Sequence, residues 1–257
     1  MSLREPLVPT GFLMLMAVVP FAFFVEAVTG FGSIILTVAL AAHFYPLQGL
    51  LPVLLPVNVA LSLYIVTRHH EAVDWSVLLK RILPLMALGL PLGLLTFHSQ
   101  PGAWLQLGFA LFVVALSALE LARHAQVARG LPRPLHPALE GTLLLAGGVI
   151  HGLYATGGPL VVYVASRSLP DKRRLRSTLS ALWLLLNTVL LSSYAFSGAL
   201  SGQTLTLSAL LLVPLALGLG VGEWVHPRMP QGVFRLLVFM VLLAAGALLA
   251  ARSRGLP

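Results

Sequence analysis

The sequence predicts an all-α membrane protein with many spans, because it is apolar, poor in charge and internally repeated. Hydrophobic residues make up 58% of the 257 residues and charged residues only 9%, whereas a soluble domain has roughly 25% charged residues. Charge-free stretches such as 27–67 and 177–222 exceed the roughly 20 residues that cross a bilayer as a helix. The chain also repeats itself after about 125–130 residues. We therefore expect about eight to ten transmembrane segments in two repeats.

The apolar sequence divides into ten segments, five in each half. They lie near 8–28, 33–44, 47–67, 76–97 and 103–122, and then near 138–154, 158–167, 174–197, 205–225 and 232–251. The second segment of each half has about 10–12 residues, or roughly 15–18 Å of helix, which is half of a bilayer. We interpret these two segments as half-helices at the centre of the fold.

Unusual residues recur at matching positions of the two halves. Asn58 falls on Asn187, and Glu26 falls on His151. Gly89 and Gly93 match Gly218 and Gly222 as small-xxx-small pairs, which favour close helix packing. The sequence thus predicts a first repeat over 1–122, a cytoplasmic linker over 123–137 and a second repeat over 138–257.

The charges predict that the two repeats have inverted topology. The basic loop 68–81 matches the uncharged loop 197–203, and the basic loop 167–176 matches the bare turn 43–46. Lys and Arg hold loops in the cytoplasm, so matched loops of opposite character belong on opposite faces. We therefore expect both termini outside the cell membrane, in the periplasm. Of the 16 basic residues, those placed outside are Arg4, Arg252 and Arg254.

The net charge of +8 is then explained by topology, and we expect no nucleic acid partner. The chain has no Cys, which excludes disulfides and thiolate metal sites. The N-terminal apolar run has no small-residue cleavage site, so we expect a retained first helix rather than a signal peptide. The expected partners are the lipid bilayer, a small anion, a coupling ion (H⁺ or Na⁺) and a second copy in a homodimer.

The most polar interruptions of the apolar sequence precede the two short segments. They are Thr29, Gly30, Phe31, Gly32 and Ser33 in the first half, and Thr156, Gly157 and Gly158 in the second. Unwound backbone at membrane depth is tolerated where it lines a cavity. The first turn of a helix also offers free N–H groups to an anion. These residues are candidate substrate ligands; the alternative is that the glycines serve only close packing.

Polar side chains near these breaks are further candidates. Asn58 and Asn187 sit within Leu-rich helices, where each amide needs a ligand or an interhelical hydrogen bond, including one to the other Asn. Glu26 and His151 are intramembrane ionisable groups, which suggests proton coupling, although a neutral structural role is equally consistent. Arg167 ends the second half-helix and is a candidate for gating an anion path.

An enzyme is the weaker hypothesis. We find no HExxH pair, no paired-acid motif and no His pair at metal-binding spacing. A membrane-embedded hydrolase or reductase would need a catalytic Ser or Thr near a base. We predict no catalytic residue, no cofactor and no metal.

At these residues the sequence resembles the TauE/SafE family of bacterial membrane anion carriers, the sulfite and organosulfonate exporters. The resemblance rests on the runs 28–32 and 73–75 in the first half, and on 156–163, 166–170 and 176–178 in the second. It covers nearly the whole chain.

The resemblance implies an inner-membrane exporter of small sulfur-containing or carboxylic anions, such as sulfite, sulfoacetate or related sulfonates. Many relatives have a longer glycine run where this chain has Phe31, which favours a ligand with a small carbon moiety. Together with the half-helix pattern, this predicts a secondary transporter that works by alternating access. An anion channel and a carboxylate transporter are the alternatives.

Overall fold

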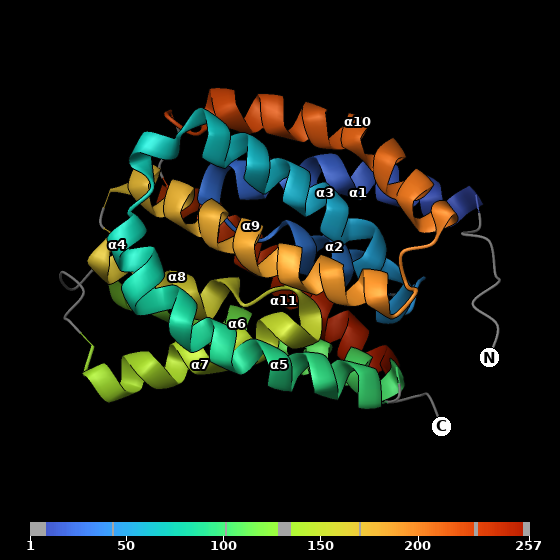
Figure 1. Cartoon of the computed structure of the whole chain (residues 1–257), viewed down its shortest axis with the longest axis horizontal. Coiled ribbons are helices and arrows are strands. Elements are labelled where there is room, and N and C mark those ends of the chain that lie inside the picture. Colours follow the sequence, from blue (N-terminus) through green and yellow to red (C-terminus); the bar gives the residue numbers. More distant parts are fainter. Residues whose placement is uncertain are drawn as a thin grey trace.

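The computed structural model describes residues 9–42, 44–100, 102–127, 135–169, 171–228 and 231–253. All the regular structure in these ranges is helical, which confirms the all-α prediction (Figure 1). Most helices run along the long axis of the molecule, as expected of a bundle that crosses a membrane. Several residues used in the charge argument lie outside the described ranges: Arg4, Arg129, Arg133 and Arg254.

The helices agree with the predicted segments to within a few residues at nearly every end. In the first half they are α1 (Pro9–Thr29), α2 (Ser33–Ala41), α3 (Leu47–Arg68), η1 (His70–Ala72), α4 (Trp75–Val77), η2 (Leu78–Ile82), α5 (Leu83–Ser99) and α6 (Gly102–Val127). In the second half they are α7 (Pro137–Tyr154), α8 (Gly158–Ser168), α9 (Lys172–Phe196), α10 (Gly202–Val225) and α11 (Gln231–Ser253). The segment predicted near 76–97 is one rod made of α4, η2 and α5, in which η2 is a π-helical turn.

Side-chain caps explain where several helices begin. The side chains of Asp74, Asp171 and Ser201 accept hydrogen bonds from the backbone N–H groups of Val77, Arg174 and Thr204, respectively. Such caps satisfy N–H groups that have no partner within the helix. The half-helices differ, because the N-cap residues of α2 and α8 are glycines, which have no side chain to accept such a bond.

Six helical stretches in the described ranges are long and apolar enough to cross a membrane. They are Phe12–Thr29, Leu47–Arg68, Trp75–Ser99, Gly102–Ala122, Lys172–Phe196 and Gly202–Val225. The chain is therefore a multi-pass helical membrane protein. The finer count of eight to ten segments and the repeat boundaries stay predictions.

Glycines allow α5 to pack closely against α7, and α1 against α10. A Cβ on Gly89 or Gly148 would overlap a backbone carbonyl of the facing helix, from Leu145 or Met86, and Gly218 meets Pro20 of α1 in the same way. The backbones approach this closely only because these residues lack a side chain. The predicted packing role of the glycine pairs is confirmed.

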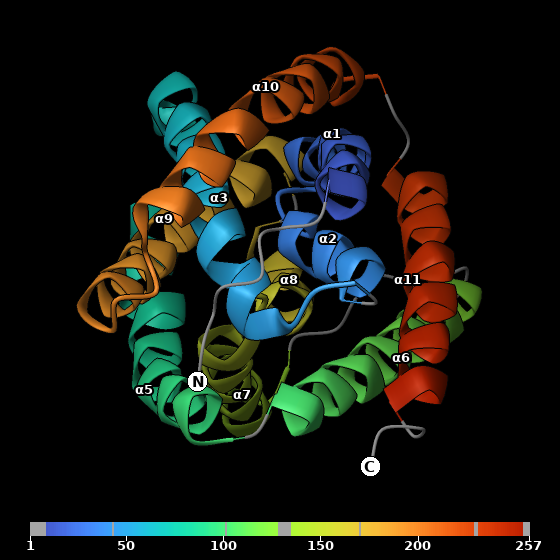
Figure 2. The same cartoon turned by 90° about the vertical axis from the view of Figure 1, so that its right-hand side faces the viewer.

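The two short helices lie at the centre of the bundle. In the view along the long axis, α2 and α8 lie near the middle and the longer helices surround them (Figure 2). Eight of the nine residues of α2 are buried. With 9 and 11 residues, α2 and α8 reach roughly half the thickness of a bilayer, as expected for half-helices.

Candidate functional site

The two breaks that precede the half-helices begin with the same backbone geometry, at the ends of α1 and α7. The N–H groups of Gly30 and Ala155 each donate to the carbonyl four residues earlier, at 2.7 Å. Both residues have a positive φ, 86° for Gly30 and 53° for Ala155, which is a common way to end a helix. A Cβ on Gly158 would lie 3.2 Å from the Cβ of Phe31, so the two breaks touch each other.

In the first break, Glu26 caps the half-helix α2. The backbone N–H of Ser33 donates to Glu26 Oε2 at 2.9 Å. The Asn58 side chain, which comes from α3, donates to both carboxylate oxygens at 3.0 and 3.1 Å and lies 2.9 Å from Ser33 Oγ. Glu26 and Asn58 are 4% and 2% exposed. The Glu26 carboxylate thus accepts from Ser33 N–H and from the Asn58 amide, which suits its ionised form.

In the second break, His151 has the matching role for α8. The backbone N–H of Gly157 donates to His151 Nδ1 at 3.3 Å. Because that backbone group can only donate, Nδ1 must accept, and the proton of the neutral imidazole lies on Nε2. Nε2 lies 3.0 Å from Oδ1 of Asn187, which comes from α9, and therefore donates to it.

A hydrogen bond between the two asparagines joins the halves at the centre of this network. Asn187 Nδ2 donates to Asn58 Oδ1 at 2.7 Å, which is the interhelical bond between the two asparagines that the sequence left open as the alternative to a ligand. The bonds now run in one direction, from Gly157 N–H through His151, Asn187 and Asn58 to the Glu26 carboxylate. The side-chain amides of Asn58 and Asn187 in this network each have both a donor and an acceptor partner, as burial requires.

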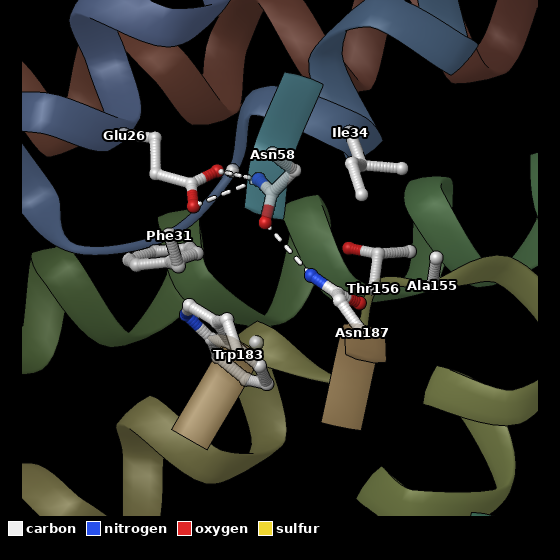
Figure 3. A pocket seen from close by; sticks show the side chains of 10 residues that line it. Glu26, Phe31, Ile34, Asn58, Ala155, Thr156, Trp183 and Asn187 are labelled. Carbon is white, nitrogen blue, oxygen red and sulfur yellow. Dashed lines mark hydrogen bonds between the residues drawn. The ribbon is translucent and has the colours of Figure 1, made fainter. Parts of the chain in front are cut away.

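A small cavity lies beside this network, between the N-termini of α2 and α8 (Figure 3). Its volume is about 20 Å³, enough for about one water molecule in this conformation. The ligand must therefore be small. The lining residues are Glu26, Phe31, Gly32, Ile34, Asn58, Ala155, Thr156, Gly158, Trp183 and Asn187.

Trp183 of α9 links both breaks to the cavity. Its indole Nε1 donates to Gly30 O at 2.8 Å, and its ring stacks on His151 with the ring centres 5.3 Å apart. In Figure 3, Trp183 and Phe31 lie at one end of the cavity, and Ile34, Ala155 and Thr156 lie at the other. Trp183 lies one helical turn before Asn187, so both side chains project from the same face of α9.

Most of the predicted site residues line the cavity or bond to residues that line it. Seven of the cavity residues were predicted: Glu26, Phe31, Gly32, Asn58, Thr156, Gly158 and Asn187. Ser33, His151 and Gly157 belong to the hydrogen-bond network. Trp183, Ile34 and Ala155 were missed, because an apolar residue in an apolar helix gives no signal of its own.

The remaining candidates lie elsewhere. The Thr29 hydroxyl bonds to the carbonyls of Val25 and Phe31 and so stabilises the break, without lining the cavity. Gly30 is in the break itself. Arg167 ends α8, where its guanidinium donates to Tyr163 O and lies 3.7 Å from the centre of the Tyr163 ring. Among the described residues, no group of His, Cys, Asp and Glu is arranged to hold a metal ion.

A cavity beside two half-helices at the centre of a multi-pass bundle is an arrangement found in many secondary transporters. The profile of the family described as "Sulfite exporter TauE/SafE" matches residues 15–249. The chain therefore belongs to this family, as its sequence motifs indicated.

A relative supports the same class. The "Probable inner membrane transporter protein TsaS" of Comamonas testosteroni is 25% identical to this chain over 166 residues, which cover 64% of this chain and 68% of the relative. No solved structure matched this one significantly.

Proposed function

We propose that this protein is a secondary transporter that exports small sulfur-containing anions, such as sulfite, sulfoacetate or similar two-carbon sulfonates, by alternating access. The observation on which this rests is the cavity between the N-termini of α2 and α8, with Asn58 and Asn187 in its wall. The family's description names sulfite export. The relative's name supports an inner-membrane location.

The polar groups of the cavity suit an anion. The first turns of α2 and α8 contain backbone N–H groups without intrahelical partners, at the positive ends of two helix dipoles. Glu26 already accepts from the Ser33 N–H of α2, and Pro159 in the first turn of α8 has no N–H. The Thr156 side chain and the two amides add further polar groups. The lining matches the chemistry of an oxyanion with a short carbon group, because Phe31, Ile34 and Ala155 give the cavity an apolar side. The cavity must widen to admit such an anion, as alternating access requires.

Glu26 supports a proposal about coupling. It lines the same cavity, and its hydrogen bonds suit the ionised form. A second negative charge close by is unfavourable in a poorly solvated site. A H⁺ or Na⁺ that neutralises Glu26 would therefore strengthen anion binding, so that the anion and the cation bind together.

The helix pairings support the inverted repeat. The first helix of each half packs against the fourth segment of the other half, α1 against α10 and α7 against α5, while α3 packs on α9 and α6 on α11. A two-fold axis that relates the two halves would place the α1–α10 pair on the α7–α5 pair. The same axis would place the α3–α9 pair and the α6–α11 pair each on itself. We also propose that both termini lie in the periplasm and that two copies form a homodimer.

Counterflow in proteoliposomes tests the proposed function. Purified protein should exchange internal unlabelled sulfite for external labelled sulfite with saturable kinetics. Uptake that stays linear with concentration and shows no counterflow would instead indicate a channel. Parallel competition with thiosulfate, sulfoacetate, taurine and acetate ranks the substrate classes, and preference for acetate would favour a carboxylate transporter.

The pH profile tests the coupling. In wild type, sulfite affinity should rise as the pH falls, because protonation of Glu26 removes its charge. Glu26→Gln should bind sulfite with little dependence on pH, and His151→Ala tests the second ionisable group in the same assay. A Glu26→Gln profile identical to that of the wild type would remove Glu26 from the coupling.

A further inference from the structure

Arg176 differs from the other basic residues at the start of α9. Arg173 and Arg174 are exposed, whereas Arg176 is only 4% exposed. A basic residue that only orients a loop has no reason to be buried, because burying a charge costs free energy. The position of Arg176 therefore calls for a role that its neighbours do not share.

Arg176 lies between the first break and the end of the bundle that is predicted to face the cytoplasm. A Cβ on Gly30 would lie 3.0 Å from Arg176 Cα, so the break packs directly against this residue. Arg176, Trp183 and Asn187 are spaced by seven and four residues, which places them on one face of α9. Arg176 is thus on the same face as the cavity residues, roughly 16 Å along the axis from Asn187.

The partners of Arg176 leave part of its hydrogen-bonding capacity unused. Its guanidinium Nη2 donates to Glu223 Oε1, and the other oxygen of Glu223 lies 3.3 Å from Nε2 of His69. Arg176 Nε and His69 Nδ1 are both buried, and neither has a hydrogen-bond partner among the described residues. A buried polar atom without a hydrogen-bond partner destabilises the folded state. Of these two atoms, Arg176 Nε always carries a proton to donate, so the guanidinium can bind more oxygens than Glu223 supplies.

Lys172 and His226 lie near Arg176 and Glu223. Lys172 Nζ donates to His226 O at 3.1 Å, and His226 Nδ1 lies 2.8 Å from Val28 O. Burial lowers the pKa of His226 below its usual value, so His226 is neutral at pH 7. Arg176 and Lys172 therefore give the site its positive charge, against the carboxylate of Glu223.

We propose that Arg176 and His69 form a second anion site, on the path between the central cavity and the cytoplasm, in which the Glu223 carboxylate occupies the place of the substrate. The proposal rests on the proposed function. A sulfite or sulfonate group presents several oxygens to the planar guanidinium, which binds such groups through paired hydrogen bonds. The Glu223 side chain is 27% exposed and can move aside, whereas that of Arg176 is 4% exposed.

Two substitutions separate this role from a purely structural ion pair, because the two roles predict different signs. Sulfite competes with Glu223 for Arg176 in the proposed site. Glu223→Gln should therefore lower the KM for sulfite on the cytoplasmic side by about threefold, the effect of a partly exposed ion pair. Arg176→Gln should raise the same KM about tenfold or more, since it removes hydrogen bonds to a charged ligand. A structural pair predicts the same loss of stability in both variants and no gain in affinity.

The experiment measures counterflow of labelled sulfite in proteoliposomes of defined orientation, with sulfite varied on the cytoplasmic side. Arg174→Gln is the matched control, because Arg174 is an exposed arginine of the same helix, and its KM should equal that of the wild type. Arg176→Lys keeps the charge and should give an intermediate KM. If Arg176→Gln does not fold, the direction of the Glu223→Gln effect decides.

The outcomes separate the two proposals. A lower KM for Glu223→Gln together with a higher KM for Arg176→Gln supports the second site. An unchanged or raised KM for Glu223→Gln overturns it, while counterflow by the wild type leaves the proposed function intact. Absence of counterflow in the wild type, for sulfite and for the other sulfur anions, overturns the proposed function and this inference with it.

Discussion

The break after α1 places a carboxylate beside the start of its half-helix, whereas the break after α7 places an imidazole at the matching position. Glu26 accepts from Ser33 N–H, and His151 accepts from Gly157 N–H. The roles toward their own half-helices are thus the same. The roles toward the partner asparagines are opposite, since Glu26 accepts from Asn58 and His151 donates to Asn187.

The hydrogen bond between the two asparagines explains this difference. In a single N–H···O bond one residue donates and the other accepts, so Asn58 and Asn187 cannot be equivalent. The side-chain oxygen of Asn58 accepts the bond from Asn187, so the amide protons of Asn58 still need an acceptor. The side-chain nitrogen of Asn187 donates that bond, so the oxygen of Asn187 still needs a donor. A duplicated fold can satisfy both asparagines only if the groups that bond to them differ, as the carboxylate of Glu26 and the imidazole of His151 do.

The largest loss of stability is expected when the two ends of the hydrogen-bond network, Glu26 and His151, both become carboxylates. His151→Glu places an acceptor where Asn187 needs a donor and adds a second buried charge. An uncompensated buried charge costs about 3–5 kcal/mol. His151→Gln, which can donate and accept, is the matched control and should be much milder. Unfolding in detergent measures both, and equal stability of the two variants would contradict the directional network.

A smaller effect is expected from the glycines that precede the half-helices. Gly32 has a φ of 113°, with 3.7 Å of room to Val25 Cγ1, so Gly32→Ala costs only backbone strain, about 1–2 kcal/mol. Gly157 has an ordinary φ of −76°, but a Cβ would overlap Gly147 O. Gly157→Ala should therefore cost more, about 2–3 kcal/mol. The reverse order of melting temperatures would show that the two breaks are packed differently from this description.

The smallest effect, and a favourable one, is expected at Ala155. Its matching residue is Gly30, and both have a positive φ, which strains a residue that has a Cβ. Ala155→Gly should stabilise the protein by about 0.5–1 kcal/mol, after the greater chain entropy of glycine is counted. Gly30→Ala is the reciprocal variant and should destabilise the protein, because its Cβ would also crowd Arg176. A lower melting temperature for Ala155→Gly would contradict the strain.

The sequence was sufficient to predict the helices, the two breaks and the meeting of the asparagines. These features follow from local rules and from the repeat: apolar runs set the helices, glycines interrupt them, and repeat symmetry brings matching residues together. The contact between Asn58 and Asn187 spans 129 residues of sequence and was still predictable for that reason.

Other features depend on contacts that no local pattern reveals. Ala155 adopts a left-handed conformation although alanine favours helices, because the fold requires a turn there. Trp183 resembles any apolar residue of a membrane helix until its indole meets Gly30 O. Arg176 belongs to a run of basic residues, and only its packing against the first break distinguishes it from them.

The most direct test of the central claim is the shift in melting temperature that sulfite causes in the purified protein. Sulfite should stabilise the wild type, because a ligand that binds only the folded state raises its stability. Thr188→Ala, at an exposed position of α9, should keep this shift. Asn58→Ala and Asn187→Ala should each lose most of it, since they remove polar groups from the cavity. A full shift in both asparagine variants would contradict an anion site between the two half-helices.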